Sequence, residues 1–467
     1  MRQKFRLKPN RLLLGLAACV AVAGAAAEPV VSWHAKRLPP AGAAPAGGGN
    51  YTPAGSQMPT DAGAREAWES GRRALQAGQL DAADEAFRRA STLEPRAYAP
   101  VLGLADVALY RGRLGEADKL MARARELAPK SAEVAAASGR MAVASQRLPD
   151  AHAEFRRAIA LDPRFITPHL DLAELQLSAG NNGEAAATFR AAMAADPKHP
   201  GAPFGLARAL AARGDWAGAI AALDQSALIA PRNPLPWVAK SEIQSRQKQF
   251  NQALTTVDNA LALEPEFLPA RLAKVDILAA AGKHELAIAE MRRLTGRAEG
   301  AAAAPLFVKL GSLQRASKQP ADAEASFRRA VEIDPKHHAA WNNIAWLVAE
   351  QRGDLDKALS ASKRALDLAP GTAIYEDTLG FVHLARGDLN EAATAFGKAI
   401  QVAPGAPDFH FRLGQTQERQ GQADRALASY QAALNVGVPF AAADLARQRV
   451  AALGGGVRKF QPPISRP

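Results

Sequence analysis

The chain has 467 residues, of which 48% are hydrophobic, 6% are aromatic and only one is cysteine, and its formal net charge is +12 at pH 7. A single cysteine excludes an internal disulfide, a paired-cysteine redox motif and a cysteine-rich zinc site. The positive charge is concentrated at the ends, with +5 in residues 1–63, +4 in residues 441–467 and +3 in residues 64–440. A nucleic-acid-binding protein instead concentrates Lys and Arg on its folded surface, so we expect no nucleic-acid partner.

Residues 1–27 have the pattern of an export signal. Five basic residues up to Arg11 precede the apolar stretch Leu12–Ala27, which is shorter than the ~20 residues that span a bilayer and ends in small residues suited to signal peptidase. Cleavage after Ala27 is the preferred interpretation. Two alternatives stay open, namely acylation of Cys19, which ends the lipobox-like segment LAAC, and an uncleaved anchor. We expect an exported, periplasmic protein that meets the membrane only through its N-terminus.

Two other stretches lack the large apolar side chains that a core requires. Residues 28–63 are rich in Pro, Gly and Ala, and residues 454–467 have the same character. Segments of this kind cannot bury enough apolar surface to offset the entropy of ordering. We expect a flexible linker before the folded part and a disordered tail after it.

The middle of the chain repeats with a period of 34 residues, marked by proline. Alanine stands twelve residues before each proline and usually again five residues before it, and a large residue stands eight residues before it in most repeats. The prolines are Pro95, Pro129, Pro163, Pro197, Pro231 and Pro265, followed after a gap by Pro335, Pro370 and Pro404. The large residues are Phe87, Met121, Phe155, Phe189, Phe327 and Phe396.

This spacing predicts a helix that packs closely on its neighbours and ends at the proline. Alanine, the large residue and the second alanine fall on one helical face, so a neighbouring helix can approach the alanines while the large side chain fills the space beside them. Proline then stops the helix. A glycine is expected to turn the chain between the two helices of each unit. These turn glycines are Gly78, Gly112, Gly180, Gly214, Gly282, Gly353, Gly387 and Gly421.

Segments such as AADEAFRRASTLEP, AHAEFRRAIALDP, AEASFRRAVEIDP and EAATAFGKAIQVAP resemble the tetratricopeptide repeat (TPR), a helix-turn-helix unit of about 34 residues. The resemblance implies an all-α fold, a right-handed α-solenoid whose first helices line a concave face that binds a peptide or a partner helix. The stretch from Trp341 to Pro404 is also similar to arrays in envelope proteins of exopolysaccharide and exosortase-type surface systems.

Counting from the prolines gives about eleven units, units 1–7 in residues 64–303 and units 8–11 in residues 304–440. The seventh unit lacks its terminal proline, and the interval from Pro265 to Pro335 is two residues longer than two units, so we expect a joint there. Residues 441–453 form a short amphipathic pattern. A helix at this place would cap the apolar end of the stack.

Groove-facing positions in the last three units are the candidate partner site. They are Asn342, Trp346, Asp377, Phe381, Phe411 and Gln415. Three aromatics on successive units are placed to anchor apolar side chains of a ligand. The alternative, that Trp346 and Phe381 only pack between adjacent first helices, stays open. Some TPR arrays hold acidic C-terminal peptides in a clamp of Lys, Asn and Arg, and Asn343 matches one clamp position, but no basic residues stand around it, so this ligand class is rejected.

Other conspicuous residues predict no chemistry. The Arg-Arg pairs at 88–89, 156–157 and 328–329 fit outward, solvated positions of second helices. His337 and His338 have no further metal ligands at suitable spacing. No glycine-rich phosphate loop and no nucleophile elbow occurs in the sequence. We therefore expect no metal, no cofactor and no enzymatic activity.

The sequence favours a non-catalytic scaffold or adaptor of the bacterial cell envelope with a protein or peptide partner. The alternative is an accessory subunit that recruits or regulates an envelope enzyme, such as an exopolysaccharide glycosyltransferase or a peptidoglycan hydrolase. The two hypotheses differ in whether adding the protein changes the turnover of such an enzyme.

Overall fold

A computed structural model describes residues 59–454, and this part of the chain contains 23 α-helices, one short 3-10 helix and no strand. The all-α helical-repeat solenoid expected from the sequence is confirmed. The predicted signal peptide with Cys19, the predicted linker up to residue 58 and the predicted tail beyond Gly454 lie outside the described residues. Among the helices of residues 59–454, none combines the length and the apolar character needed to cross a membrane.

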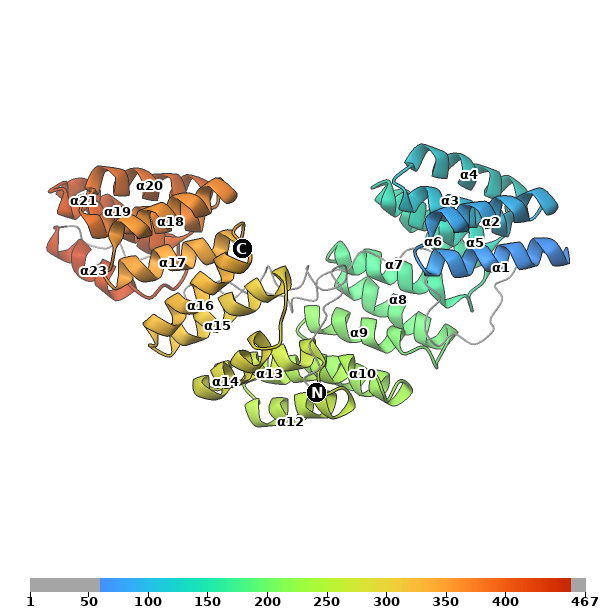
Figure 1. The fold of residues 1–467 in the computed structure, drawn as a ribbon, viewed down its shortest axis with the longest axis horizontal. Coiled ribbons are helices and arrows are strands. Elements are labelled where there is room, and N and C mark those ends of the chain that lie inside the picture. Colours follow the sequence, from blue (N-terminus) through green and yellow to red (C-terminus); the bar gives the residue numbers. More distant parts are fainter. Residues whose placement is uncertain (1–58, 455–467) are drawn as a thin grey trace, which may run out of the picture. The chain divides into compact units, whose positions relative to one another are not determined.

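First and second helices alternate along the chain (Figure 1). The first helices are α1 (Ala62–Gln76), α3 (Tyr98–Tyr110), α5 (Ala132–Ala144), α7 (Ile166–Ser178), α9 (Gly201–Ala212), α11 (Leu235–Arg246), α13 (Leu268–Ala280), α15 (Ala304–Ala316), α17 (His338–Glu350), α19 (Ala373–Arg386) and α21 (Pro407–Arg419). The second helices are α2 (Leu80–Leu93), α4 (Leu114–Leu127), α6 (Leu148–Leu161), α8 (Asn182–Ala195), α10 (Trp216–Ile229), α12 (Phe250–Leu263), α14 (His284–Thr295), α16 (Pro320–Ile333), α18 (Leu355–Leu368), α20 (Leu389–Val402) and α22 (Ala423–Asn435). The 3-10 helix η1 (Ala301–Ala303) precedes α15, and α23 (Ala443–Ala452) follows the last pair.

The described residues form two compact units, an N-terminal unit up to Ala273 and a C-terminal unit from Lys274. The boundary lies inside α13, about one repeat before residue 303, where the sequence predicts the joint. The residues around 303 are irregular, since Gly300 has a φ of +66° and η1 follows it. The division of the array at residues 303 and 304 stays a prediction.

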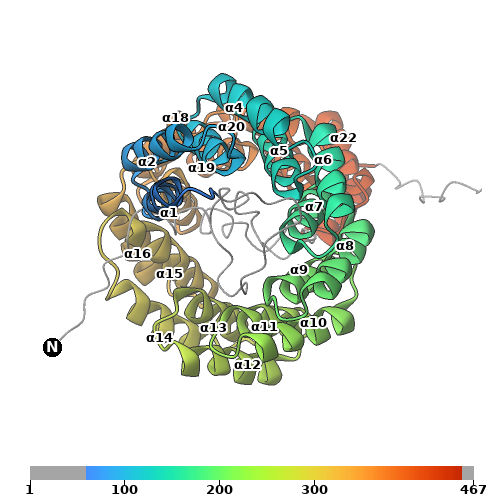
Figure 2. The same ribbon diagram turned by 90° about the vertical axis from the view of Figure 1, so that its right-hand side faces the viewer.

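Within the N-terminal unit, the first helices lie on the inner side of a curve. Figure 2 shows α5, α7, α9 and α11 on this inner side and α6, α8, α10 and α12 on the outer side. Successive first helices also contact one another, as α1 does α3 and α7 does α9. The inner surface is therefore built from first helices, as the sequence predicts.

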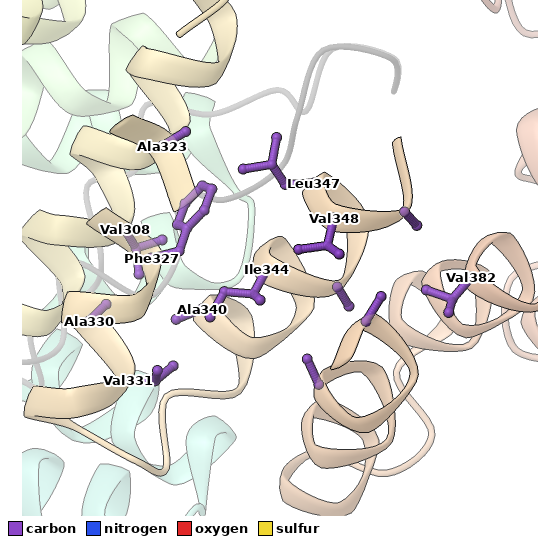
Figure 3. Packing of buried hydrophobic residues seen from close by; sticks show 14 of the residues in the cluster. Val308, Ala323, Phe327, Ala330, Val331, Ala340, Ile344, Leu347, Val348 and Val382 are labelled. Carbon is purple, nitrogen blue, oxygen red and sulfur yellow. The ribbon is translucent and has the colours of Figure 1, made fainter. Parts of the chain in front are cut away.

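The core of the C-terminal unit is formed where second helices pack on the following first helices. Figure 3 shows Phe327 and Val331 of α16 beside Ala340 and Ile344 of α17, with Val348 continuing the same face. Ala323, Phe327 and Ala330, the three positions of the repeat pattern, are at most 1% exposed. The pattern therefore predicts correctly which face of the second helix is buried.

Aromatic rings of second helices lie directly against glycines of first helices. A Cβ atom added to Gly380 would lie 2.7 Å from Cε1 of Phe396, and one added to Gly311 would lie 2.6 Å from Cε1 of Phe327. Real Cβ atoms do not approach so closely, so these positions require glycine if the ring stays in place. The absence of a side chain lets the first helix sit directly on the aromatic ring.

The turn between the two helices of a unit contains one residue in the left-handed region. Glycine takes it at seven of the eight predicted positions, whereas in the ninth unit it is Arg352, with a φ of 53°. The prediction of Gly353 is wrong. This unit has one residue more than most, since Pro370 stands 35 residues after Pro335, and the extra residue follows the turn, which stays two residues beyond Glu350, the end of α17. Gln146, Lys248 and Lys318 take the same conformation in other units.

The last helix, α23, closes the end of the C-terminal unit. Ala446 and Val450 are fully buried and pack with Phe411 and Tyr430 of the last helix pair. Arg449 Nη2 also forms an ion pair with Glu418 Oε1 at 2.7 Å. α23 thus covers an apolar surface that would otherwise face water.

Candidate functional site

The predicted site residues of the ninth and tenth units lie on the successive first helices α17 and α19. Asn342 and Trp346 are one helical turn apart on α17, and Asp377 and Phe381 have the same spacing on α19. Residues four apart share a helical face, so each helix presents one polar and one aromatic side chain on the same side. Asn342 and Asp377 are 8% and 2% exposed, and both aromatic residues are half-buried.

The two aromatic side chains contact each other. The ring centroids of Trp346 and Phe381 are 4.4 Å apart and their planes are inclined by 23°, which is a stacked arrangement. Phe381 also packs against the core that α16, α17 and α18 share. Stacking of this kind contributes about 0.5–1.5 kcal/mol beyond the area it buries. The packing role that the sequence left open is therefore present, and the part of the rings that stays exposed also offers an apolar surface.

Arg412 of α21 completes this group, although sequence reasoning did not select it. Its Cζ lies 4.6 Å from the ring centroid of Trp346 and 6.0 Å from that of Phe381. Its Nη1 donates to Oδ2 of Asp377 in an ion pair. The side chain thus reaches from the last unit across the two preceding first helices. We call Asn342, Trp346, Asp377, Phe381 and Arg412 the inner cluster.

The two residues predicted on α21 do not both belong to the inner cluster. Phe411 is 6% exposed and lies in the core, with its ring centroid 5.5 Å from that of Tyr430 and 6.2 Å from that of Phe440. The structure therefore assigns Phe411 to packing between α21, α22 and the segment before α23, and not to a groove. Gln415 is half-buried and stands three residues after Arg412, on the same side of α21.

Three buried polar atoms of the inner cluster lack a hydrogen-bond partner among the described residues. They are Asn342 Oδ1, Trp346 Nε1 and Asp377 Oδ1. A buried donor or acceptor without a partner costs about 1–3 kcal/mol, so native proteins contain few of them and a group of them calls for an explanation. The neighbouring Asn343 Nδ2 is also buried without a partner.

The main electrostatic effect in the inner cluster concerns Asp377. Burial raises the pKa of its carboxyl group above the ordinary value, the ion pair with Arg412 opposes this rise, and the charge of Asp408 adds to it. Removal from water disfavours a charged carboxylate unless cations and hydrogen-bond donors replace the water. Arg412 supplies such donors to only one of the two oxygens.

Glu376, the residue before Asp377, lines a different surface. It borders a shallow cavity between α19 and α20 together with His383, Glu391 and Lys398. Consecutive helical residues do not face each other. Glu376 is therefore not counted in the inner cluster.

The residues that the sequence set aside have structural contacts. His337 caps α17 by accepting a hydrogen bond from the Ala340 amide, and His338 Nδ1 lies 2.6 Å from Tyr375 Oη. Within residues 59–454, no three metal-binding side chains come together. Arg88 and Arg328 form ion pairs with Asp84 and Glu324 of their own helices, and their side chains are more than half exposed. The outer arginines thus match a solvated face.

Comparison with protein families identifies the repeat. Two family models, both described as tetratricopeptide repeat, match the chain, one at residues 74–141 and 177–243 and the other at residues 239–303, 308–373 and 378–444. Together they cover more than two thirds of the sequence. The chain belongs to the tetratricopeptide repeat family. TPR proteins generally mediate protein–protein interactions, and the TPR scaffold is typically non-catalytic.

Solved structures similar to this TPR chain are also TPR proteins. Yeast Tom70 is 13% identical, with a TM-score of 0.46 over 84% of this chain and 94% of the Tom70 chain. The Cut9–Hcn1 hetero-tetramer of APC/C gives 12% identity and a TM-score of 0.41 over 84% of this chain and 96% of the other. YrrB, described as a TPR protein with an unusual peptide-binding site, is 22% identical, with a TM-score of 0.31 over 39% of this chain and 92% of its own. No curated protein matches the chain.

Proposed function

We propose that this TPR protein is a non-catalytic scaffold that binds a peptide or a partner helix at the inner cluster of its C-terminal unit. One observation supports the proposal above the others. Asn342 Oδ1, Trp346 Nε1 and Asp377 Oδ1 are buried without partners beside a stacked aromatic pair. A purely structural cluster gains nothing from unpaired polar atoms, whereas a binding site uses them when the ligand arrives.

A peptide suits the chemistry of these atoms. The main chain of an extended segment alternates N–H donors and C=O acceptors, so it can donate to Asn342 Oδ1 and accept from Trp346 Nε1. The half-exposed rings of Trp346 and Phe381 would contact an apolar part of the ligand. Buried aromatic residues at the centre of an interface usually supply much of its binding energy.

The cell envelope is the proposed site of action. The basic residues before Leu12–Ala27 and the small residues at the end of that stretch support export. Mass spectrometry of the mature N-terminus in the native bacterium would distinguish cleavage after Ala27, acylation of Cys19 and an uncleaved N-terminus. A chain starting at Glu28 supports cleavage and a lipid-modified Cys19 supports acylation, whereas a cytoplasmic protein with an intact Met1 would contradict export.

A photo-crosslinker beside the inner cluster tests the binding proposal. A photoreactive amino acid replaces Gln415, which lies on the same side of α21 as Arg412, and captured peptides are identified by mass spectrometry from living cells. The matched control places the same amino acid at Arg328, an exposed position on α16. We expect a defined adduct at Gln415 that the Trp346→Ala substitution reduces roughly tenfold, as for an interface hot spot.

Two results would contradict the proposal. One is equal capture of the same proteins at Gln415 and Arg328, which would indicate non-specific contact. The other is an adduct at Gln415 that persists unchanged in both Trp346→Ala and Asn342→Ala variants, because the inner cluster would then take no part in binding.

A further inference from the structure

The unpaired atoms of the inner cluster define what a ligand must supply. Two of the three are oxygen acceptors, on Asn342 and Asp377, and one is the nitrogen donor of Trp346. A carboxylate oxygen can only accept a hydrogen bond, and it forms its strongest bonds with charged donors. The demand at Asp377 Oδ1 is therefore for an N–H group, preferably one that carries a positive charge.

The charges around Asp377 leave this demand unmet. Those that act on its carboxyl group are the guanidinium of Arg412 and the carboxylate of Asp408. Arg412 is bound to Oδ2 and lies against the Trp346 ring. Arg412 thus brings one positive charge to Asp377, and Asp408 adds a second negative charge. The side chain of Asp377 is only 3% exposed. Water therefore stabilises its negative charge little and does not replace a second cation.

We infer that the peptide bound at the inner cluster carries a basic side chain, lysine or arginine, that donates to Asp377 Oδ1. This inference rests on the proposed function, since it names the ligand class of the same site. The main chain beside the basic residue bonds to Asn342 Oδ1 and Trp346 Nε1. The aliphatic stem of lysine or arginine packs along the rings of Trp346 and Phe381, and its charged head lies beside the carboxylate.

An acidic ligand does not fit this arrangement. A glutamate side chain or a C-terminal carboxylate would add a further negative charge to those of Asp377 and Asp408, while Arg412, the cation that acts on Asp377 among residues 59–454, is already paired with it. Like charges brought together across an interface weaken the complex by roughly several kcal/mol. The inner cluster therefore has the opposite charge preference to a clamp for acidic tails.

Charge-matched peptides measure the preference directly. The probes are end-capped, fluorescein-labelled peptides of about nine residues, an extended length of about 30 Å. They have one Ala/Leu sequence and differ only in a central Lys, Gln or Glu. Binding to the full-length protein is followed by fluorescence anisotropy at low and moderate salt. We expect the Lys peptide to bind about tenfold more tightly than the Gln peptide and the Glu peptide to bind weakest.

Two substitutions separate the charge effect from a loss of structure. Asp377→Asn should abolish the difference between the Lys and Gln peptides. Because this change also removes the partner of Arg412, Asp408→Asn is the second variant. It keeps the ion pair and should reduce the preference for Lys about threefold. Asp322→Asn, at an exposed acidic residue of α16, is the matched control and should leave all three affinities unchanged.

The outcomes distinguish this inference from the proposed function. If the Gln or Glu peptide binds as tightly as the Lys peptide and binding depends on Trp346, the inference is overturned and peptide binding stands. If the preference for Lys persists in both Asp377→Asn and Asp408→Asn, the inference is also overturned. If no peptide binds and the crosslinker at Gln415 captures nothing, the proposed function and the inference fail together.

Discussion

At the scale of single residues, the aromatic rings of the second helices and the small residues of the first helices match in size. Phe396 of a second helix faces Gly380 of the first helix of its own unit, and Tyr430 faces Gly414 in the same way. Phe189 instead lies against Gly205 of the following unit, where a Cβ atom would overlap the ring. The packing rule thus concerns the space around the ring, which either neighbouring first helix can provide.

This match predicts a coupled pair of substitutions in the tenth unit. Gly380→Ala should destabilise the C-terminal unit by about 1–3 kcal/mol, because the new methyl group overlaps the Phe396 ring. Phe396→Leu alone should cost about 1–2 kcal/mol through the cavity it leaves. The double variant should lose at least about 0.5 kcal/mol less than the sum, because leucine frees space for the methyl group.

Hydrogen exchange of the α19 and α20 amides, followed during denaturant titration, would measure these changes. If the losses of stability from the two substitutions simply added in the double variant, Gly380 would be required for a reason other than contact with the Phe396 ring.

At the scale of helical elements, charged side chains link the inner helices of the N-terminal unit. Arg140 Nη1 of α5 lies 3.2 Å from Asp171 Oδ2 of α7, and Arg208 Nη1 of α9 lies 2.5 Å from Glu174 Oε1 of α7. Asp106 of α3 extends the series, since it stands 34 residues before Arg140, as Glu174 does before Arg208. Positive and negative charges thus alternate from one first helix to the next. The ion pairs link α5 to α7 and α7 to α9, helices that also contact each other directly.

Asp106 makes this series sensitive to pH. Burial raises the pKa of its carboxyl group to about 7, and Arg140 only partly opposes the rise. The unfolded chain loses this proton near pH 4, at roughly the ordinary pKa. Between about pH 4 and pH 7 the folded state therefore binds a proton that the unfolded state has released, and the free energy of unfolding falls as pH rises through this window.

Asp106→Asn should remove this contribution. We expect the variant to be more stable than the wild type by on the order of 1 kcal/mol at about pH 8 and nearly equal to it at about pH 4, near the ordinary pKa of the unfolded carboxyl group. Urea denaturation of both proteins at the two pH values measures the difference. If the free energy of unfolding changed with pH in the same way for both proteins, the Asp106 carboxyl group would ionise equally easily in the folded and unfolded states, which would contradict the prediction.

At the scale of the whole molecule, contacts join neighbouring helices in sequence, as between α20 and α21 or α22 and α23. Stability in such an array is roughly a sum of units and of the interfaces between neighbours, so a defect should act mainly on nearby units. The end of the C-terminal unit depends on α23, whose Val450 is fully buried.

Val450→Asp should therefore loosen the array from this end. A buried, unpaired charge would detach α23 and expose Phe411 and Tyr430, with an estimated loss of about 3 kcal/mol. Amide hydrogen exchange should accelerate in α21, α22 and α23 and stay unchanged in α1 to α6. Uniform acceleration along the chain would mean that the array unfolds as one cooperative body. Val450→Ala, which keeps the site apolar, is the control and should produce a smaller change.

The repeat length, the alternation of first and second helices and the buried alanines and aromatics could all be predicted from the order of the residues. These follow from spacing along one helix, where residues at intervals of three or four share a face whatever the rest of the chain does. Glycine at most of the turns and the two polar–aromatic pairs on α17 and α19 belong to the same class of local pattern.

Which side chains meet between units depends on how the helices pack in three dimensions. Arg412 rather than Phe411 joins the inner cluster, because a step of one residue rotates a side chain by about 100° around the helix and the long arginine then reaches two helices away. Arg352 rather than Gly353 forms the turn for a similar reason, since one inserted residue changes which position follows the helix end. The unpaired atoms of Asn342, Trp346 and Asp377 could not be found by spacing either, because whether a polar atom has a partner depends on the whole surrounding surface.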